Sequence, residues 1–138
     1  LALLHKIDIL PAELVLVQAA NESAWGTSRF ARKGYNFFGI WCFVKGCGFV
    51  PGKRNAGATH EVAKFPSLSR ATYTYMRNLN RHDAYTDLRE IRERLRANQI
   101  PITGVALAEG LMNYSERGAA YVDELQTMIR FNQEFLTE

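Results

Sequence analysis

Residues 18–31 of the chain read QAANESAWGTSRFA, and the residue that stands out in this stretch is Glu22. The segment that leads into it is apolar and helical in pattern, and a Trp-Gly pair shortly after it is expected to end the helix. Glu22 follows Gln18 and Ala19 by one helical turn, so the spacing places its carboxylate on a small-residue, partly buried face. The carboxylate there is either an ordinary solvated group or an acid placed for chemistry.

The electrostatics of a helix end give the second alternative a physical basis. A helix C-terminus carries partial negative charge, which opposes a carboxylate in the last turn and, with desolvation, is expected to raise the pKa of Glu22. A raised pKa suits a general acid that works near neutral pH. A glutamate at a helix end is nevertheless more often just solvated, so this residue alone does not decide between the two.

The size of the chain predicts one globular domain over residues 1–138 with a single modest core. The chain has 138 residues, of which 47% are hydrophobic and 22% charged. Leu1 already belongs to the amphipathic run LALLHKIDIL. We therefore expect a domain excised from a longer precursor.

The charge balance suits anionic partners. The formal net charge is +3 and the pI is about 9.0, which fits nucleic acid, phospholipid surfaces and acidic cell-wall polymer alike. The basic residues are scattered along the chain, and the run REIRERLR (89–96) interleaves Arg with Glu at helical spacing. We interpret this run as a solvated helix face with internal ion pairs. The pattern argues against a nucleic-acid partner.

The two cysteines, Cys42 and Cys47, flank a glycine-containing turn in WCFVKGCGF (41–49). The turn can bring the sulfurs together, and a disulfide closing so short a loop would stabilise the fold by about 2 kcal/mol. Two reduced thiols in a cytosolic protein are the alternative at this point. A zinc site is not expected, because the spacing differs from CxxC pairs and the three His are dispersed.

Apolar spacing and turn formers predict a mainly α-helical domain with a small irregular β-hairpin lobe at residues 40–65, made of two short β-like pieces. The expected helices are one before Pro11, one from Pro11 to Trp25, a short one capped by Thr27 or Ser28, one capped by the Ser after Pro66, a charged one at 82–99 ended by Pro101, and two at about 103–113 and 118–135. The core side of the last helix is expected to carry Tyr121, Leu125, Met128, Ile129 and Phe135.

Two aromatic segments suit a sugar site. YNFFGI (35–40) is a glycine turn flanked by aromatic residues, and in NYSERGAAYV (113–122) Tyr114 follows one helix while Tyr121 opens the next. Exposed rings beside a carboxylate suit a carbohydrate cleft, since pyranose rings stack on them. Taken singly, each ring is more often a core residue.

These segments together resemble the peptidoglycan-cleaving β-N-acetylglucosaminidases of glycoside hydrolase family 73. QAANESAWGTSRFARKGYNFFGIW (18–41) resembles the family's A-x-E-S-x-W-G-x-S helix end with its following N-x-F-G-I, and NYSERGAAYV is similar to its later two-tyrosine element. FPSLSRATYTYMRNL (65–79) is similar to a third family segment, but Pro66 and Leu68 stand where Arg and Tyr are usual. Across nearly all of the chain the closer likeness is to the Bax subgroup, including its C-x-x-x-x-C pair and YSxxGxxY.

The resemblance implies roles for single residues. Glu22 matches the catalytic glutamate and would be the general acid, and Tyr114 matches the aromatic residue at the cleaved bond. The residues expected to contact substrate or form the cleft floor are Trp25, Asn36, Phe38, Gly39 and Tyr121.

A second carboxylate does not carry over cleanly. Other members have a Thr-x-Glu on the β lobe, some distance before the Phe of the following helix. Here the acid of the lobe is Glu61 in ATHEVAKF (58–65), which lies too near Phe65 to align well with that element. A mobile lobe could bring Glu61 to a base position. Alternatively, the substrate's N-acetyl group could be the internal nucleophile, assisted by Tyr114. Three candidates for the second catalytic group therefore remain: Glu61, the substrate's N-acetyl group and Tyr114.

The resemblance implies a lysozyme-like helical fold that acts as a glycoside hydrolase on the β-1,4 bond after N-acetylglucosamine in peptidoglycan. The compartment would be the periplasm or the cell exterior, which favours a Cys42–Cys47 disulfide. Peptidoglycan glycan strands are the expected partner of a monomer, and neither a metal nor a cofactor is implied. Two alternatives remain: a muramidase or lytic transglycosylase on the same fold, and a catalytically inactive cell-wall-binding module.

Overall fold

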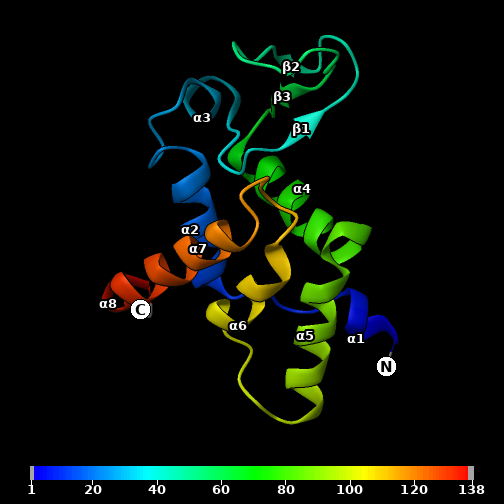
Figure 1. Ribbon diagram of the computed structural model, residues 1–138, viewed down its shortest axis with the longest axis vertical. Helices are drawn as coiled ribbons and strands as arrows, with labels where there is room; N and C mark the ends of the chain where they lie inside the picture. The colour runs from blue at the N-terminus through cyan, green and yellow to red at the C-terminus, as the bar shows by residue number, and fades with distance from the viewer. Residues whose placement is uncertain (1, 137–138) are drawn as a thin grey trace. The chain divides into compact units, whose positions relative to one another are not determined.

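The computed structural model describes residues 2–136 and is mainly helical, with one small antiparallel sheet (Figure 1). The predicted fold class is confirmed. The α-helices are α1 (Ala2–Lys6), α2 (Ala12–Glu22), α3 (Arg29–Gly34), α4 (Leu68–Arg81), α5 (Thr86–Ala97), α6 (Gly104–Ala108), α7 (Ala119–Phe131) and α8 (Gln133–Leu136). Strands β1 (Trp41–Cys42), β2 (Gly48–Phe49) and β3 (Glu61–Ala63) and the 3-10 turns η1 (Asp83–Tyr85) and η2 (Glu109–Leu111) complete the structure. Leu1, in the expected first amphipathic run, lies outside the described residues.

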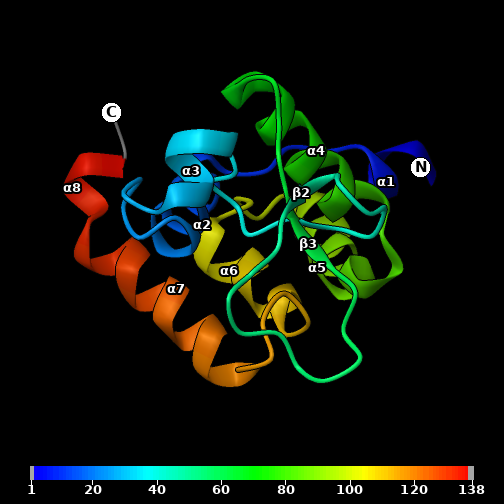
Figure 2. The ribbon, with the colours of Figure 1, turned by 90° about the horizontal axis from the view of Figure 1, so that it is seen from above.

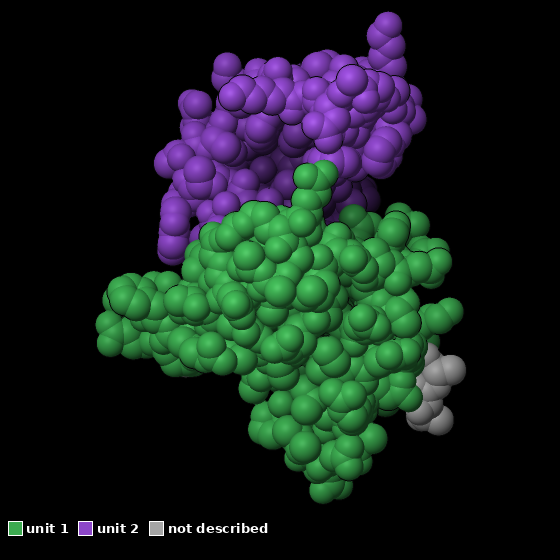
Figure 3. Space-filling model, in the orientation of Figure 1, with its two compact units in different colours: residues 1–18, 76–138 green, residues 19–75 purple. Residues whose placement is uncertain are grey.

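The chain divides into two compact units, coloured separately in Figure 3. Unit 1 comprises residues 1–18 and 76–138, and unit 2 comprises residues 19–75. The boundaries between the units fall within α2 and α4. Among the described residues, no helix has both the length and the apolar character needed to cross a membrane.

Unit 1 is a set of helices around a leucine-rich core. Helix α6 packs beside α7, and α5 contacts α1, α6 and η2 (Figure 2). Gly110 allows η2 to approach α5 closely, because a Cβ on it would lie 2.3 Å from the Cα atom of Leu88. Six leucines of this core have no solvent exposure: Leu14, Leu79, Leu88, Leu107, Leu111 and Leu125.

The charged run at residues 89–96 lies in α5, and only part of it faces solvent. Arg89 and Arg92 are buried, so the interpretation of this run as a solvated face is wrong for these two residues. The guanidinium of Arg92 donates hydrogen bonds to the main-chain carbonyls of Asp8 and Ile9, and that of Arg89 donates to the carbonyl of Leu79. A guanidinium has five donors, so a buried Arg can satisfy carbonyls that no helix or sheet pairs.

The last helix is shorter than predicted. Helix α7 ends at Phe131, and Asn132 turns the chain out of the helix before α8 begins; both its main-chain and side-chain N–H groups donate to the Met128 carbonyl. This break changes the helical phase. The prediction that Phe135 faces the core is therefore wrong, and its side chain is 75% exposed. Tyr121, like Leu125 and Ile129 in the same helix, is buried as predicted.

Unit 2 contains the three-stranded sheet, one strand more than predicted. The strand order is β1-β3-β2, so β3 is central and both neighbours run antiparallel to it. Strands of two or three residues carry too little alternation to be recognised in the sequence. The predicted helix caps are confirmed: the Ser28 hydroxyl accepts from the Ala31 N–H, and Ser67 after Pro66 accepts from the Arg70 N–H.

Candidate active site

Glu22 is the last residue of α2, and the chain leaves the helix there by a strained turn. Ala24 and Trp25, two successive residues that are not glycine, have φ angles of 51° and 57°. The buried Ser23 holds this turn, because its hydroxyl accepts a hydrogen bond of 2.8 Å from the Gly26 N–H. Strain of this kind is concentrated at functional sites. The half-buried Glu22 therefore has a fixed main-chain position at the helix end.

Gly39 lies against the carboxylate of Glu22. A Cβ atom on Gly39 would be 2.7 Å from Oε2 of Glu22, and the φ angle of the glycine is +68°, which side chains rarely adopt. The glycine turn of the predicted motif is thus folded onto the predicted acid. Only a residue without a side chain leaves the carboxylate its present position.

Asn36 holds this turn in place with every hydrogen-bonding group of its amide. Its Nδ2 donates to the carbonyls of Ile40 and Ala63 at 2.9 and 3.0 Å, and its Oδ1 accepts from the N–H groups of Phe38 and Ile40. The side chain is 2% exposed. Asn36 therefore ties the turn to the end of β3 and has a structural place in the site.

Phe38 is equally internal. Its ring stacks on that of Tyr75 with centroids 4.2 Å apart and is buried. A ring in this position supports the turn from beneath instead of presenting a face to a sugar. Trp25, by contrast, is 70% exposed and can offer its indole to a ligand.

Cys42 and Cys47 form the predicted disulfide, with Cα atoms 6.3 Å apart. The bridge closes the connection between β1 and β2. Glu61 of β3 lies opposite Cys42 in the sheet register, and its carboxylate reaches the closed loop. Its Oε2 accepts from the Gly46 N–H at 3.0 Å and its Oε1 from the Gly48 N–H at 2.9 Å.

These two backbone donors determine the protonation of Glu61. The N–H groups of Gly46 and Gly48 stabilise the charged form and hold the pKa of Glu61 below its ordinary value, with smaller contributions from the positive charges of Arg54 and Lys45. Both carboxylate oxygens are thus used within the lobe. The geometry suits a residue that anchors the disulfide loop in its charged form.

The lowered pKa makes a prediction about acid stability. Below the ordinary pKa of 4.5 the unfolded chain binds a proton that folded Glu61 does not, so the stability gained from these bonds is full above that pH and is lost as pH falls through the lowered folded pKa. We expect Glu61→Gln to flatten the dependence of the thermal unfolding midpoint on pH below about 4.5, measured by circular dichroism.

The matched control for this experiment is the exposed Glu116, in Glu116→Gln. It should keep the acid dependence of the wild type. If the thermal unfolding midpoint depended on pH in the same way for the wild type and Glu61→Gln, the anchoring role of Glu61 would be contradicted. Asp8 also has a lowered pKa, through its hydrogen bond with Arg96, so part of the dependence should remain in both variants.

The two predicted tyrosines meet within unit 1. The rings of Tyr114 and Tyr121 are parallel to within 2°, with centroids 5.8 Å apart, and the Tyr121 hydroxyl accepts a hydrogen bond of 3.1 Å from Nε2 of Gln18. Tyr121 is buried, whereas Tyr114 is half-buried. The ring of Tyr85 lies 5.9 Å from that of Tyr114. Tyr114 is therefore the ring of this pair with access to solvent, and Tyr121 supports it.

Gln18 and Tyr85 were not predicted as site residues. Gln18 has no solvent exposure although its neighbours on α2 are apolar, and a polar residue at a core position is the signal that could have identified it. Tyr85 follows a His and an Asp at the start of a charged segment, and nothing in that pattern predicts its contact with Tyr114. Within residues 2–136, no three His, Cys, Asp or Glu side chains gather as a metal site would require.

Comparison with known proteins gives two matches that cover nearly the whole chain. The family model described as glucosaminidase, mannosyl-glycoprotein endo-beta-N-acetylglucosaminidase, matches residues 1–134. Protein bax of Escherichia coli (strain K12) is 36% identical over 134 residues, which is 97% of this chain and 47% of that protein. The chain thus spans about half the length of this relative. No solved structure gives a significant match.

Proposed function

Because the chain belongs to the glucosaminidase family, glycoside hydrolase family 73, we propose that it hydrolyses the β-1,4 bond after N-acetylglucosamine in peptidoglycan. The observation that carries the proposal is the half-buried carboxylate of Glu22, fixed at the strained end of α2 against the bare Cα of Gly39. A glycosidase needs one carboxylic acid to protonate the leaving oxygen. Glu22 has this role in the proposal.

The second group in the proposal is the substrate's own N-acetyl group, assisted by Tyr114. Both oxygens of Glu61 accept main-chain hydrogen bonds, which favours an anchoring role over a nucleophile or base. The acetamido oxygen attacks the anomeric carbon while the glycosidic bond breaks and the leaving oxygen takes the proton of Glu22. Water then opens the cyclic intermediate and returns a proton to Glu22. The phenol of Tyr114 would orient the acetamido group.

The products of digestion test the reaction. We expect mass spectrometry of digested peptidoglycan to find reducing-end N-acetylglucosamine. Reducing-end N-acetylmuramic acid, or its anhydro form, would instead identify a muramidase or a lytic transglycosylase. The proposed compartment is the periplasm or the cell exterior, and the Cys42–Cys47 disulfide supports it because such bridges persist in oxidising environments.

Gly39→Ala should reduce activity by about tenfold or more, because the added Cβ displaces the Glu22 carboxylate. Turnover on peptidoglycan measures this. The matched control is Gly57→Ala: Gly57 also has a positive φ, of +82°, but a Cβ there meets no atom within 4 Å. Both variants should lose about 1–2 kcal/mol of stability from the left-handed backbone. If the two lose activity equally, the contact with Glu22 has no catalytic importance.

A further inference from the structure

The charges of the chain are divided unequally between its two units. Unit 2 contains eight Lys and Arg against two acids, Glu22 and Glu61, a net charge of +6. Unit 1 contains nine Lys and Arg against twelve Asp and Glu, a net charge of −3. The continuous segment 19–75 therefore forms a cationic unit, because it contains only two of the chain's acids. Such a unit attracts anionic surfaces.

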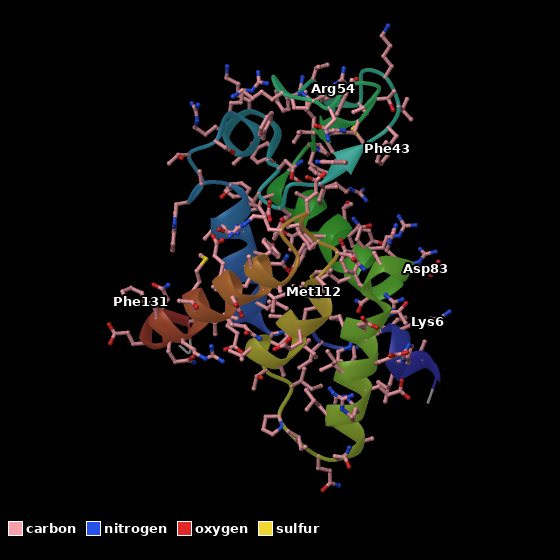
Figure 4. The ribbon with its side chains drawn as sticks, in the orientation of Figure 1. Lys6, Phe43, Arg54, Asp83, Met112 and Phe131 are labelled. Carbon is pink, nitrogen blue, oxygen red and sulfur yellow. A yellow bond between two sulfur atoms is a disulfide. The ribbon has the colours of Figure 1, made fainter. Side chains whose placement is uncertain are left out.

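This cationic unit exposes an apolar tip, which we define as Trp41, Phe43 and Val44. Their side chains are 51%, 70% and 75% exposed. All three lie in or beside the loop that the Cys42–Cys47 disulfide closes, and Figure 4 shows Phe43 on the lobe formed by the strands. Three neighbouring bulky apolar residues in solvent mark a contact site on a protein surface. A closed loop also loses little conformational entropy when it binds.

Two exposed cations flank the apolar tip. Lys45 follows Val44 directly in the loop. On the other flank, the imidazole of His60 stacks on the indole of Trp41 with centroids 3.6 Å apart, and Arg54 donates a hydrogen bond to the His60 carbonyl at 2.9 Å. Arg54 lies on the same lobe as Phe43 (Figure 4). Apolar groups and positive charges are thus combined at one place.

We propose that the apolar tip and its two cations bind the surface of an anionic lipid bilayer. Phe43 and Val44 enter the apolar layer below the headgroups, Trp41 lies at headgroup level, and Lys45 and Arg54 pair with lipid phosphates. A glycan fits this surface less well, because Val44 has no ring face for stacking and His60 already covers one face of Trp41. The proposal requires no hydrolysis, so it stands apart from the proposed function.

Vesicle sedimentation tests the proposal. The wild type should bind vesicles of phosphatidylcholine with phosphatidylglycerol, should not bind phosphatidylcholine alone, and should bind less as salt rises. The double variant Phe43→Ser, Val44→Ser should bind at least about tenfold more weakly. Lys45→Gln with Arg54→Gln should lose about fivefold for each charge. The controls in unit 1, Phe131→Ser and Arg77→Gln, change an aromatic residue that is 85% exposed and an exposed cation, and both variants should bind as the wild type does.

Tryptophan fluorescence gives an independent measurement. The chain has two Trp, so Trp25→Phe leaves Trp41 as the only emitter, and its emission should shift to the blue on phosphatidylglycerol vesicles. Near-ultraviolet circular dichroism checks that each variant is folded. If the double variant Phe43→Ser, Val44→Ser does not fold, the single variant Phe43→Ser is used in its place. Vesicle binding unchanged by Phe43→Ser would overturn the proposal in favour of charge alone. Binding to insoluble peptidoglycan but not to vesicles, lost in the same variants, would assign the apolar tip to the wall polymer.

Discussion

Replacing Glu22 by Gln is expected to lower turnover on peptidoglycan by about 10²- to 10⁴-fold, the usual contribution of a general acid. The amide has the size of the carboxylate and keeps the contact with Gly39, so the fold should be preserved. The thermal unfolding midpoint should be equal or higher, because an acid held at a helix C-terminus is removed. Release of soluble muropeptides and a thermal melt measure the two effects.

The matched control for Glu22→Gln is Glu13→Gln in the same helix. Glu13 accepts a hydrogen bond from the Gly104 N–H, which a glutamine oxygen can also accept, so this variant should keep its activity. An active Glu22→Gln variant would refute the assignment of the acid. Loss of activity with retained binding to peptidoglycan would exclude the catalytically inactive wall-binding module.

Tyr114→Phe is expected to lower turnover by about tenfold or more, equivalent to about 1.4 kcal/mol of transition-state stabilisation. Phenylalanine keeps the stacking with Tyr121 and the ring contact with Tyr85, so only the hydroxyl is lost and folding should be intact. Steady-state kinetics should therefore show a fall in kcat at an unchanged melting temperature. The control is Tyr73→Phe, a tyrosine 58% exposed on α4, which should have no effect.

Glu61→Gln separates the two candidates for the second catalytic group. If Tyr114 assists the N-acetyl group, Glu61→Gln should reduce activity less than Tyr114→Phe does, and in parallel with its loss of stability. If instead Tyr114→Phe keeps full activity and Glu61→Gln abolishes it while remaining folded, Glu61 is the second catalytic group. The hydrogen bonds from Gly46 and Gly48 would then position a catalytic carboxylate.

Several parts of the fold could be predicted because their signals are local. Ser28 and Ser67 cap helices through bonds to residues three positions later, so the cap and its partner lie in one short stretch. The Cys42–Cys47 bridge likewise joins residues five positions apart. The error at Phe135 has a local cause, because α7 ends before Asn132 and the helical spacing that would bury Phe135 does not continue. The error at Arg92 has a non-local cause, because the carbonyls that accept its hydrogen bonds belong to Asp8 and Ile9, far away in sequence.

In the candidate site, the residue types and their positions at a helix end, in a glycine turn and at a helix junction follow from local patterns along the chain. The contacts of these residues depend on the folded arrangement: Gly39 lies against the Glu22 carboxylate, Phe38 stacks on Tyr75, and Glu61 binds the disulfide loop. Spacing along a chain specifies which face of an element a side chain occupies. Whether that face meets solvent, a ring or a backbone donor depends on residues far away in sequence, and so does the pKa of a carboxylate such as Glu61.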